Sequence, residues 1–221
     1  MNKLNHIAFI MDGNGRWGKK KRRGRNYGHL RGVETVKQIV KYCVKSKIPI
    51  VTFYVFSSEN WRRPKTEISF LFNLIKKYFT QEIQSIMSQG IRIKIIGEIN
   101  KLPSDLKKIL NKCIKLTNKN KKILVNLAIN YGSKNEILNA SRKTKNFSIK
   151  NFEKHLYTKN IPNPDILVRT GGHQRLSNFM LWQLAYAELF FLKKLWPDFS
   201  GDDLKKIIDK FKKSKRNFGA V

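Results

Sequence analysis

The chain has 221 residues, 41% of them hydrophobic, and a formal net charge of +31 at pH 7. This length and hydrophobic content suit one globular domain, residues 1–221, and exclude an intrinsically disordered chain. The apolar runs are much shorter than the ~20 residues of a membrane-spanning helix, and the first residues lack the apolar core of a signal peptide. We therefore expect a single-domain protein that stays in the cytoplasm.

The positive charge comes from 34 lysines and 12 arginines, which are spread over most of the predicted helices. A surface of this charge attracts nucleic acids, anionic lipids and phosphorylated small molecules alike. The sequence contains no zinc-finger spacing and no aromatic-basic motif typical of RNA-binding domains. The charge is also typical of a compositional bias, so it singles out no partner. A basic nucleic-acid-binding protein is nevertheless the alternative to an enzyme.

The first predicted strand is the apolar run from Ile7 to Met11, and the glycine-rich segment D-G-N-G-R-W-G follows it from Asp12. Two glycines around an asparagine let the backbone turn with positive φ, and such a turn can aim several N–H groups at one anion. A carboxylate beside the turn suits a Mg²⁺ ion that carries a diphosphate. A lone D-G-x-G segment is more often an ordinary turn, so the remaining loops decide between these interpretations.

The segment from Lys19 to Arg25, K-K-K-R-R-G-R, is predicted as a charged loop that is either simply solvated or closes over an anionic ligand. A helix follows to about Lys47, and Ile50–Phe56 is a second strand rich in β-branched and aromatic residues. A long helix from about Glu67 to Ser88 carries an apolar face. That face either packs in the core or walls a hydrocarbon tunnel, and the sequence allows both.

Four more strands are predicted at 91–97, 123–130, 165–169 and 189–191. Helical patterns lie between and after them, including one at 182–188 and a last one that begins with a capping box at Ser200. Strands that alternate with helices indicate a parallel sheet covered on both faces. The predicted fold class is therefore α/β, with a six-stranded parallel sheet flanked by helices.

Polar loops follow three of these strands, after Met11, after Phe56 and after Arg169. Ligands of open parallel sheets bind beyond the carboxyl ends of the strands, so we expect these loops to form one site. Arginines in these loops suit phosphate oxygens, because a guanidinium group donates two parallel hydrogen bonds. With aromatic residues nearby, the loops predict ligands that join a phosphate to an apolar group.

Three segments in this order resemble the signature motifs of the cis-prenyltransferase family, of the bacterial undecaprenyl diphosphate synthase type. They are D-G-N-G-R-W from Asp12, F-S-S-E-N-W-R-R-P from Phe56, and R-T-G-G-H-Q-R-L-S-N-F-M-L-W-Q-L-A-Y-A-E from Arg169 to Glu188. The resemblance thus covers nearly the whole chain. It implies a homodimer with an apolar product tunnel, partly walled by the helical face from Ile75 to Met87.

The same resemblance implies a reaction. Farnesyl diphosphate is condensed with successive isopentenyl diphosphates, in the presence of Mg²⁺, to a long cis-polyprenyl diphosphate such as undecaprenyl diphosphate, the lipid carrier precursor for cell-wall synthesis. A shorter-chain product is the alternative within the family. Ionising an allylic C–O bond requires neutralisation of the departing diphosphate, which Mg²⁺ and arginines provide. No specific nucleic acid is expected, and the positive surface suits peripheral contact with the anionic inner face of the plasma membrane.

The resemblance also assigns roles to single residues. Asp12 and Asn60 match catalytic positions, Asp12 and Glu188 match carboxylates linked to Mg²⁺, and Glu67 matches a residue that supports the flexible loop. The allylic diphosphate positions are Gly13, Asn14, Gly15, Arg16, Trp17, Arg25 and His29. The positions in the loop that closes over the substrates are Ser57, Ser58, Glu59, Trp61 and Arg63. The isopentenyl diphosphate positions are Arg169, Arg175, Leu176 and Ser177.

The sequence departs from the family pattern in two places. His173 and Gln174 stand where bacterial members commonly have Glu and where some have His near the metal. The segment K-R-N-F-G at 215–219 has one arginine fewer than the family's usual run, at a position linked to contact across the dimer. We expect activity to survive both departures.

Overall fold

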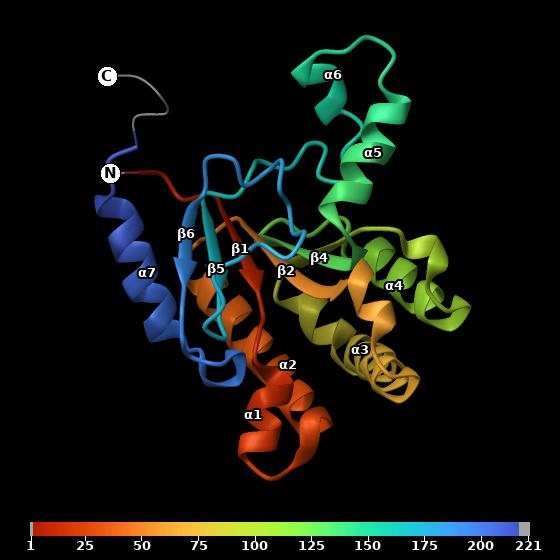
Figure 1. Ribbon diagram of the computed structural model, residues 1–221, viewed down its shortest axis with the longest axis vertical. Coiled ribbons are helices and arrows are strands. Elements are labelled where there is room, and N and C mark those ends of the chain that lie inside the picture. The colour runs from red at the N-terminus through yellow and green to blue at the C-terminus, as the bar shows by residue number, and fades with distance from the viewer. Residues whose placement is uncertain (1, 217–221) are drawn as a thin grey trace.

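In the computed structural model, which describes residues 2–216, the strands form one sheet in the order β3-β4-β2-β1-β5-β6 (Figure 1). All five neighbouring pairs are parallel, as predicted. The strands are β1 (His6–Ile10), β2 (Ile50–Ser57), β3 (Ile91–Ile96), β4 (Ile123–Tyr131), β5 (Ile166–Arg169) and β6 (Glu188–Phe191). The central strands are apolar and buried, which fits a sheet covered on both faces.

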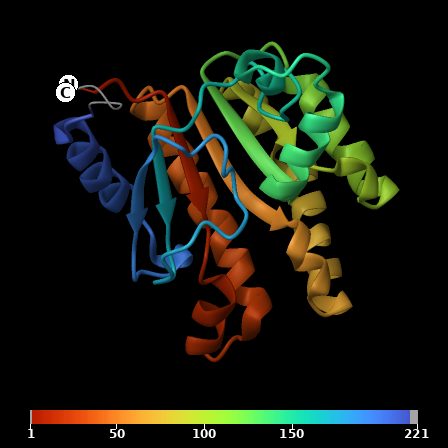
Figure 2. The same ribbon diagram turned by 45° about the horizontal axis from the view of Figure 1, so that its top comes forward.

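Helices cover one face of this sheet and irregular segments cover much of the other. The helices are α1 (Asn14–Lys20), α2 (Gly24–Lys45), α3 (Lys65–Ser88), α4 (Ser104–Thr117), α5 (Ser133–Lys143), α6 (Ile149–Glu153) and α7 (Gly201–Lys213). The larger core joins the sheet to α2, α3, α4 and α7, and Figure 2 shows α2 and α3 along the same face. Within residues 2–216, no helix is long and apolar enough to cross a membrane.

The segment predicted as a glycine-rich turn and a charged loop is instead mostly helical. Helix α1 begins directly after Gly13, whose φ is 110°, and α2 begins at Gly24. The glycines have a different purpose from the predicted one, because a Cβ atom on Gly18 would collide with the carbonyl of Gly24, and one on Gly28 with the carbonyl of Asn14. They let the two helices pack in direct backbone contact.

The helix predicted at 182–188 is wrong, because the structure has consecutive turns there. Ser177, Asn178 and Met180, just before it, have φ values of 49°, 61° and 45°, which no right-handed helix accepts. The segment nevertheless buries Phe179, Met180 and Leu184 against the second face of the sheet. Its apolar residues thus cover the sheet without helical order. The family-related segment K-R-N-F-G lies outside the described residues from Asn217 onward.

Candidate active site

A polar pocket lies at the carboxyl ends of β1, β2 and β5. It encloses about 770 Å³ of empty space, including its open mouth. Its lining residues are Ile10, Met11, Asp12, Asn14, His29, Tyr54, Val55, Ser57, Asn60, Arg63, Leu71, Arg169 and Ser177. The structure thus brings together side chains from all three polar loops that the sequence singled out.

Asp12 is held between two arginines on the wall of this pocket. Its Oδ1 lies 3.1 Å from Arg16 Nη2, and its Oδ2 lies 3.1 Å from Arg169 Nη2. The main chain around it is also fixed, because the Asp12 carbonyl accepts the hydroxyl of Thr170 at 2.8 Å. Gly171, with φ of 90°, passes so close that a Cβ atom would collide with Asp12 and Arg16. Asp12 is therefore a preorganised carboxylate at a cationic wall.

Arg169 is the most enclosed cation of the pocket, with a side chain only 4% exposed. It donates hydrogen bonds to the Ser177 hydroxyl at 2.8 Å and to the carbonyl of Arg175, and its Nε is buried without a protein partner. Burial lowers the pKa of Arg169 from its ordinary value, and the Asp12 carboxylate opposes that shift. An anionic ligand would offset the cost of burying this charge.

Glu67, on α3, gathers three further site residues, Arg25, Arg63 and His29, and its Oε1 lies 3.5 Å from His29 Nε2. Arg25 donates two hydrogen bonds of 3.0 Å to its two carboxylate oxygens, and Arg63 donates one of 3.1 Å. Burial opposes ionisation of Glu67, but the hydrogen bonds and charges of Arg25 and Arg63 outweigh it and lower the pKa of Glu67. Burial, with the charge of Arg63, lowers the pKa of His29 to about 4, so His29 is neutral at physiological pH.

The loop after β2 is ordered by asparagines. It forms the 3₁₀ turn η1 (Ser58–Arg62), in which the Ser57 N–H donates to Asn60 Oδ1 at 3.2 Å. The Trp61 indole donates to Asn130 Oδ1 at 2.8 Å, and Glu59 accepts from Asn178 Nδ2 at 2.7 Å. The side chain of Asn60 is thereby placed in the polar pocket with its oxygen already accepting a hydrogen bond.

An apolar cavity of about 760 Å³, including its open mouth, lies between α2, α3 and strands β2 and β4. Its lining residues are Met11, Asn14, His29, Gly32, Val33, Val36, Val55, Phe56, Leu71, Leu74, Ile75, Tyr78, Phe79, Leu127, Ile129 and Trp196. Met11, Val55 and Leu71 line this cavity and the polar pocket alike, so the two spaces adjoin. The polar pocket therefore adjoins the apolar cavity directly.

The apolar lining differs in extent from the predicted tunnel wall. Ile75, Tyr78 and Phe79 line the cavity as expected, and so do the earlier Leu71 and Leu74. The later residues of the predicted face, such as Ile86, pack in the core of the sheet instead. The wall is thus shifted toward the start of α3.

Comparison with known proteins decides the family. Residues 10–219 match a family model described as "Putative undecaprenyl diphosphate synthase". The isoprenyl transferases of Wolinella succinogenes and Clostridium perfringens are 43% and 41% identical, with 100% and 98% of this chain and 99% and 90% of the relatives covered. The chain belongs to the undecaprenyl diphosphate synthase family. It is a cis-prenyltransferase, which replaces the alternative of a basic nucleic-acid-binding protein.

Solved structures agree with this assignment. The lavandulyl diphosphate synthase of Lavandula x intermedia, determined with dimethylallyl diphosphate, superposes with a TM-score of 0.93 at 32% identity, covering 97% of this chain and 98% of that one. A probable undecaprenyl diphosphate synthase from Campylobacter jejuni gives 0.85 at 31% identity, covering 99% and 100%. The predicted fold class is therefore confirmed.

Not every predicted site residue of this cis-prenyltransferase lines a pocket. Those that line neither are Gly13, Gly15, Arg16, Trp17, Arg25, Ser58, Glu59, Trp61, Arg175, Leu176 and Glu188. Some of these residues instead contact a residue that lines a pocket. Arg16, for example, forms an ion pair with Asp12. Trp17 is buried, stacks on Tyr27 and donates to Asp198 Oδ1 at 2.7 Å, so in this structure it positions α1.

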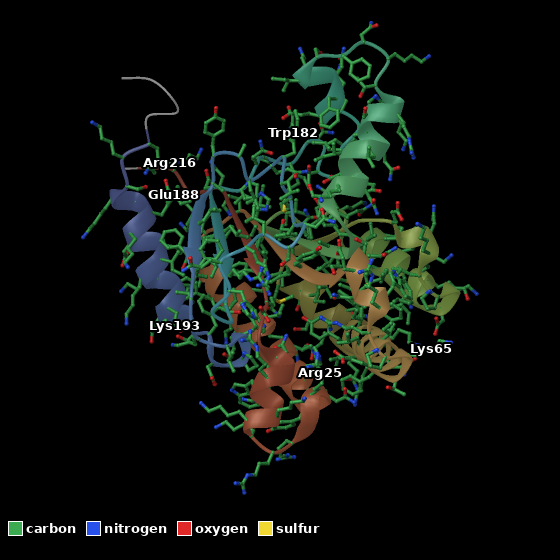
Figure 3. All side chains as sticks on the ribbon, in the orientation of Figure 1. Arg25, Lys65, Trp182, Glu188, Lys193 and Arg216 are labelled. Atoms are coloured by element: carbon green, nitrogen blue, oxygen red, sulfur yellow. The ribbon has the colours of Figure 1, made fainter. Side chains whose placement is uncertain are left out.

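Glu188 lies at the opposite end of the sheet from Asp12. Strand register aligns Glu188 with Ile166 and Ile7, whereas Asp12 follows the end of β1. Five residues of strand separate these levels, which is roughly 16 Å. Figure 3 shows Glu188 near Arg216, far from Arg25. Within one chain, the structure therefore does not bring the two predicted metal carboxylates together.

The donor set nevertheless fits a Mg²⁺ ion that arrives with a diphosphate. Among residues 2–216, no group of three or more His, Cys, Asp and Glu side chains is placed to hold a metal ion. Mg²⁺ commonly binds through one or two carboxylates plus substrate phosphates and water. Asp12, 27% exposed at its side chain, supplies one such carboxylate.

Sequence reasoning missed two residues of the site. Tyr54 lines the polar pocket and donates its hydroxyl to the carbonyl of Tyr131 at 3.1 Å. Asn178 joins three loops, because it binds Glu59 and its Oδ1 accepts the Lys134 N–H at 2.8 Å. Asn178 lies inside a recognised motif, and asparagine's tolerance of positive φ was the available signal.

Proposed function

We propose that this enzyme condenses isopentenyl diphosphate with farnesyl diphosphate, with Mg²⁺, and repeats the addition to give a long cis-polyprenyl diphosphate such as undecaprenyl diphosphate. One observation carries the proposal. The cationic pocket and the apolar cavity adjoin and share lining residues. A ligand with a diphosphate head and a hydrocarbon tail fits both compartments at once.

The allylic diphosphate would bind where Asp12 and Arg16 meet, at Gly13–Arg16 and His29. Arg16 and Arg169 neutralise charge that develops on the departing diphosphate, in a site where they are already oriented. Asp12 would hold a Mg²⁺ ion that arrives with the diphosphate, and the ion would supply further charge neutralisation. Arg25 and Arg63 contribute by way of Glu67, which fixes the loop after β2 against α3.

The hydrocarbon tail would occupy the apolar cavity. Side chains of α2 and α3, such as Val36 and Leu74, exclude water from the allylic carbon. This exclusion protects a carbocation from hydrolysis. The tail lengthens away from the diphosphates at every addition.

Isopentenyl diphosphate would bind at Arg169, Arg175 and Ser177, on the β5 side of the pocket. The proton that leaves it after C–C bond formation must be accepted nearby. An amide is a poor base, so we propose that Asn60 orients Ser57 and that the proton passes through Ser57 or directly to a diphosphate oxygen. The loop of Ser58, Glu59 and Trp61 then closes the site.

The enzyme would act as a homodimer in the cytoplasm and deliver its product to the membrane. In a dimer, Glu188 remains a predicted metal ligand only if a second copy of the chain supplies it. A single chain keeps it at the far end of the sheet.

The direct test incubates the protein with farnesyl diphosphate, labelled isopentenyl diphosphate and Mg²⁺, with EDTA as the metal control. We expect labelled polyprenyl products with Mg²⁺ and none with EDTA. Absence of extension by protein with intact circular dichroism would contradict the proposal.

A shorter product is the second candidate, favoured by the similarity to a structure determined with dimethylallyl diphosphate. Chromatography of the dephosphorylated products decides between them. A ladder that ends after one or two additions supports the shorter-chain alternative.

A further inference from the structure

Helices α5 and α6 form a projection at the end of the molecule opposite α1 (Figure 1). We call residues 142–154, at its far end, the α5–α6 tip. Two large apolar residues there face solvent. Phe147 is 77% exposed and Ile149 is 68% exposed. Among the exposed large hydrophobic residues of 2–216, Phe147 is the most exposed, and Ile149 is as exposed as Tyr186.

Helix capping does not account for Phe147. It precedes Ser148, whose hydroxyl caps α6 by accepting the Asn151 N–H. A residue in that position commonly packs on the residue four places into the helix, here Phe152. Phe152 instead packs on Trp182, with ring centroids 4.6 Å apart. The residue on which Phe147 would commonly pack is therefore engaged by Trp182, and Phe147 itself is exposed.

Exposed basic residues flank these two residues in the sequence. The exposed basic residues of the tip are Arg142, Lys143, Lys145, Lys150 and Lys154. None of them takes part in the ion pairs found within residues 2–216. The tip's one acidic residue, Glu153, accepts the Trp182 indole N–H at 3.1 Å. The tip thus carries two exposed apolar side chains and five exposed basic residues within one short segment, 142–154.

We propose that the α5–α6 tip docks on an anionic lipid bilayer. Phe147 and Ile149 enter the boundary between headgroups and acyl chains, while the flanking lysines lie against lipid phosphates. Apolar residues between cations distinguish a bilayer from a soluble polyanion, because nucleic-acid phosphates offer them no apolar phase.

The turn between α1 and α2 makes a useful contrast. Residues 19–23 are all basic and exposed, but their aromatic neighbours lie beneath the charges: Lys21 stacks over Trp17 and Arg23 over Tyr27. This turn lies at the other end of the molecule (Figures 1 and 2). Charge alone would therefore bring either end to a membrane, whereas apolar insertion selects the α5–α6 tip.

The biological reason for docking, delivery of an apolar product to a bilayer, rests on the proposed function. Membrane binding is measured without substrate, and prenyl transfer is measured without vesicles. Failure of one is therefore distinguishable from failure of the other.

The test uses an environment-sensitive dye on the full chain. Cys43 and Cys113 are buried, so a cysteine introduced by Asn146→Cys or, at the other end, by Lys21→Cys is labelled selectively. With vesicles of phosphatidylcholine and phosphatidylglycerol, we expect the dye at residue 146 to shift to the blue and the dye at residue 21 to stay unshifted. A shift at residue 21 alone, or at neither position, would overturn the proposal.

A paired variant separates insertion from charge. Phe147→Ser combined with Ile149→Ser should weaken vesicle binding about tenfold. The loss should fall chiefly on the part of the binding that persists at high salt, because apolar insertion is not screened by ions. Lys19→Ser combined with Lys20→Ser, the control, should retain that part. Prenyl transfer in detergent should be unchanged in the first pair, which shows that it folds. Equal vesicle binding by the first pair and the unaltered protein would overturn the proposal.

Discussion

The two ends of the sheet are both polar and buried, yet only one is arranged to bind a ligand. At the amino end, both ring nitrogens of His6 have partners. Nδ1 lies 2.7 Å from the Pro162 carbonyl, which can only accept, and Nε2 lies 2.7 Å from the Thr52 hydroxyl. Asp165 there accepts the N–H groups of Asn5 and His6. The His6 ring and the Asp165 carboxylate thus find hydrogen-bond partners within the chain, so they stabilise the fold.

At the carboxyl end, polar atoms face open space instead. Asp12 and Asn60 line a pocket, and the buried Nε of Arg169 has no protein partner. Because burial of polar groups occurs at both ends, burial alone does not locate the site. What distinguishes the ends is whether the polar groups are satisfied by the chain or await a ligand.

The largest expected effect comes from Asp12→Asn. The amide keeps the shape of the side chain but removes the negative charge between Arg16 and Arg169. We expect kcat to fall about 10³-fold, as for loss of a preorganised charge at an active site. Steady-state kinetics with farnesyl and isopentenyl diphosphates, together with circular dichroism, measure this.

Asp165→Asn is the matched change at the amino end. It weakens hydrogen bonds to two backbone N–H groups, so unfolding free energy should fall by about 1–3 kcal/mol. Activity per folded molecule should be retained. A large loss of kcat in this variant, with stability unchanged, would erase the distinction between the two ends.

The pH dependence of stability sharpens the same distinction. Burial lowers the pKa of His6 to about 4, from 6.5 in the unfolded chain. The unfolded state therefore binds a proton first, and stability falls as pH decreases from 6.5 toward 4. Between pH 7 and pH 5, protonation of His6 in the unfolded chain should lower the free energy of unfolding by about 2 kcal/mol.

Urea unfolding of the unaltered protein and of His6→Gln at both pH values isolates this contribution, because the shift of His29 is common to both. The loss of stability between pH 7 and pH 5 should be about 2 kcal/mol smaller in His6→Gln. Equal losses would show that His6 does not titrate as its burial requires.

The smallest effect is expected from Asn178→Ala. It removes hydrogen bonds that hold η1 and the first turn of α5 to the loop after β5. We expect the KM for isopentenyl diphosphate to rise about tenfold, with a smaller change in kcat.

Asn139→Ala is the control for Asn178→Ala, since Asn139 hydrogen-bonds Glu98 and Tyr157 away from the pockets. It should leave the KM unchanged. If both variants change the KM equally, Asn178 has no special role in positioning the site.

The sheet was predictable because most strands are short apolar runs rich in β-branched and aromatic residues, and β3 alternates isoleucines with basic residues. All six strands were placed within one or two residues. The helical conformation of residues 14–20 was not predictable. Glycines at 13, 15 and 18 lower helix propensity, yet tertiary packing against α2 imposes helix α1. Local propensity carries no record of that packing.

The position of Glu188 exposes the same limit. The predicted strand at 189–191 already placed Glu188 just before its start, but only the register of β6 against β5 and β1 shows how far that start lies from Asp12. Asn178 and Tyr54 gain their importance from contacts across 44 to 123 residues of sequence. Such long-range hydrogen bonds leave no periodic pattern in the chain.

Binding of farnesyl diphosphate by calorimetry, without isopentenyl diphosphate, tests most directly whether one amphiphile spans both pockets. Leu74→Trp fills the apolar cavity, and Leu138→Trp, on an exposed face of α5, is the control. We predict that Leu74→Trp weakens farnesyl diphosphate about tenfold or more and leaves inorganic diphosphate unchanged. Unaltered binding of farnesyl diphosphate, or equal loss of both ligands, would contradict the account.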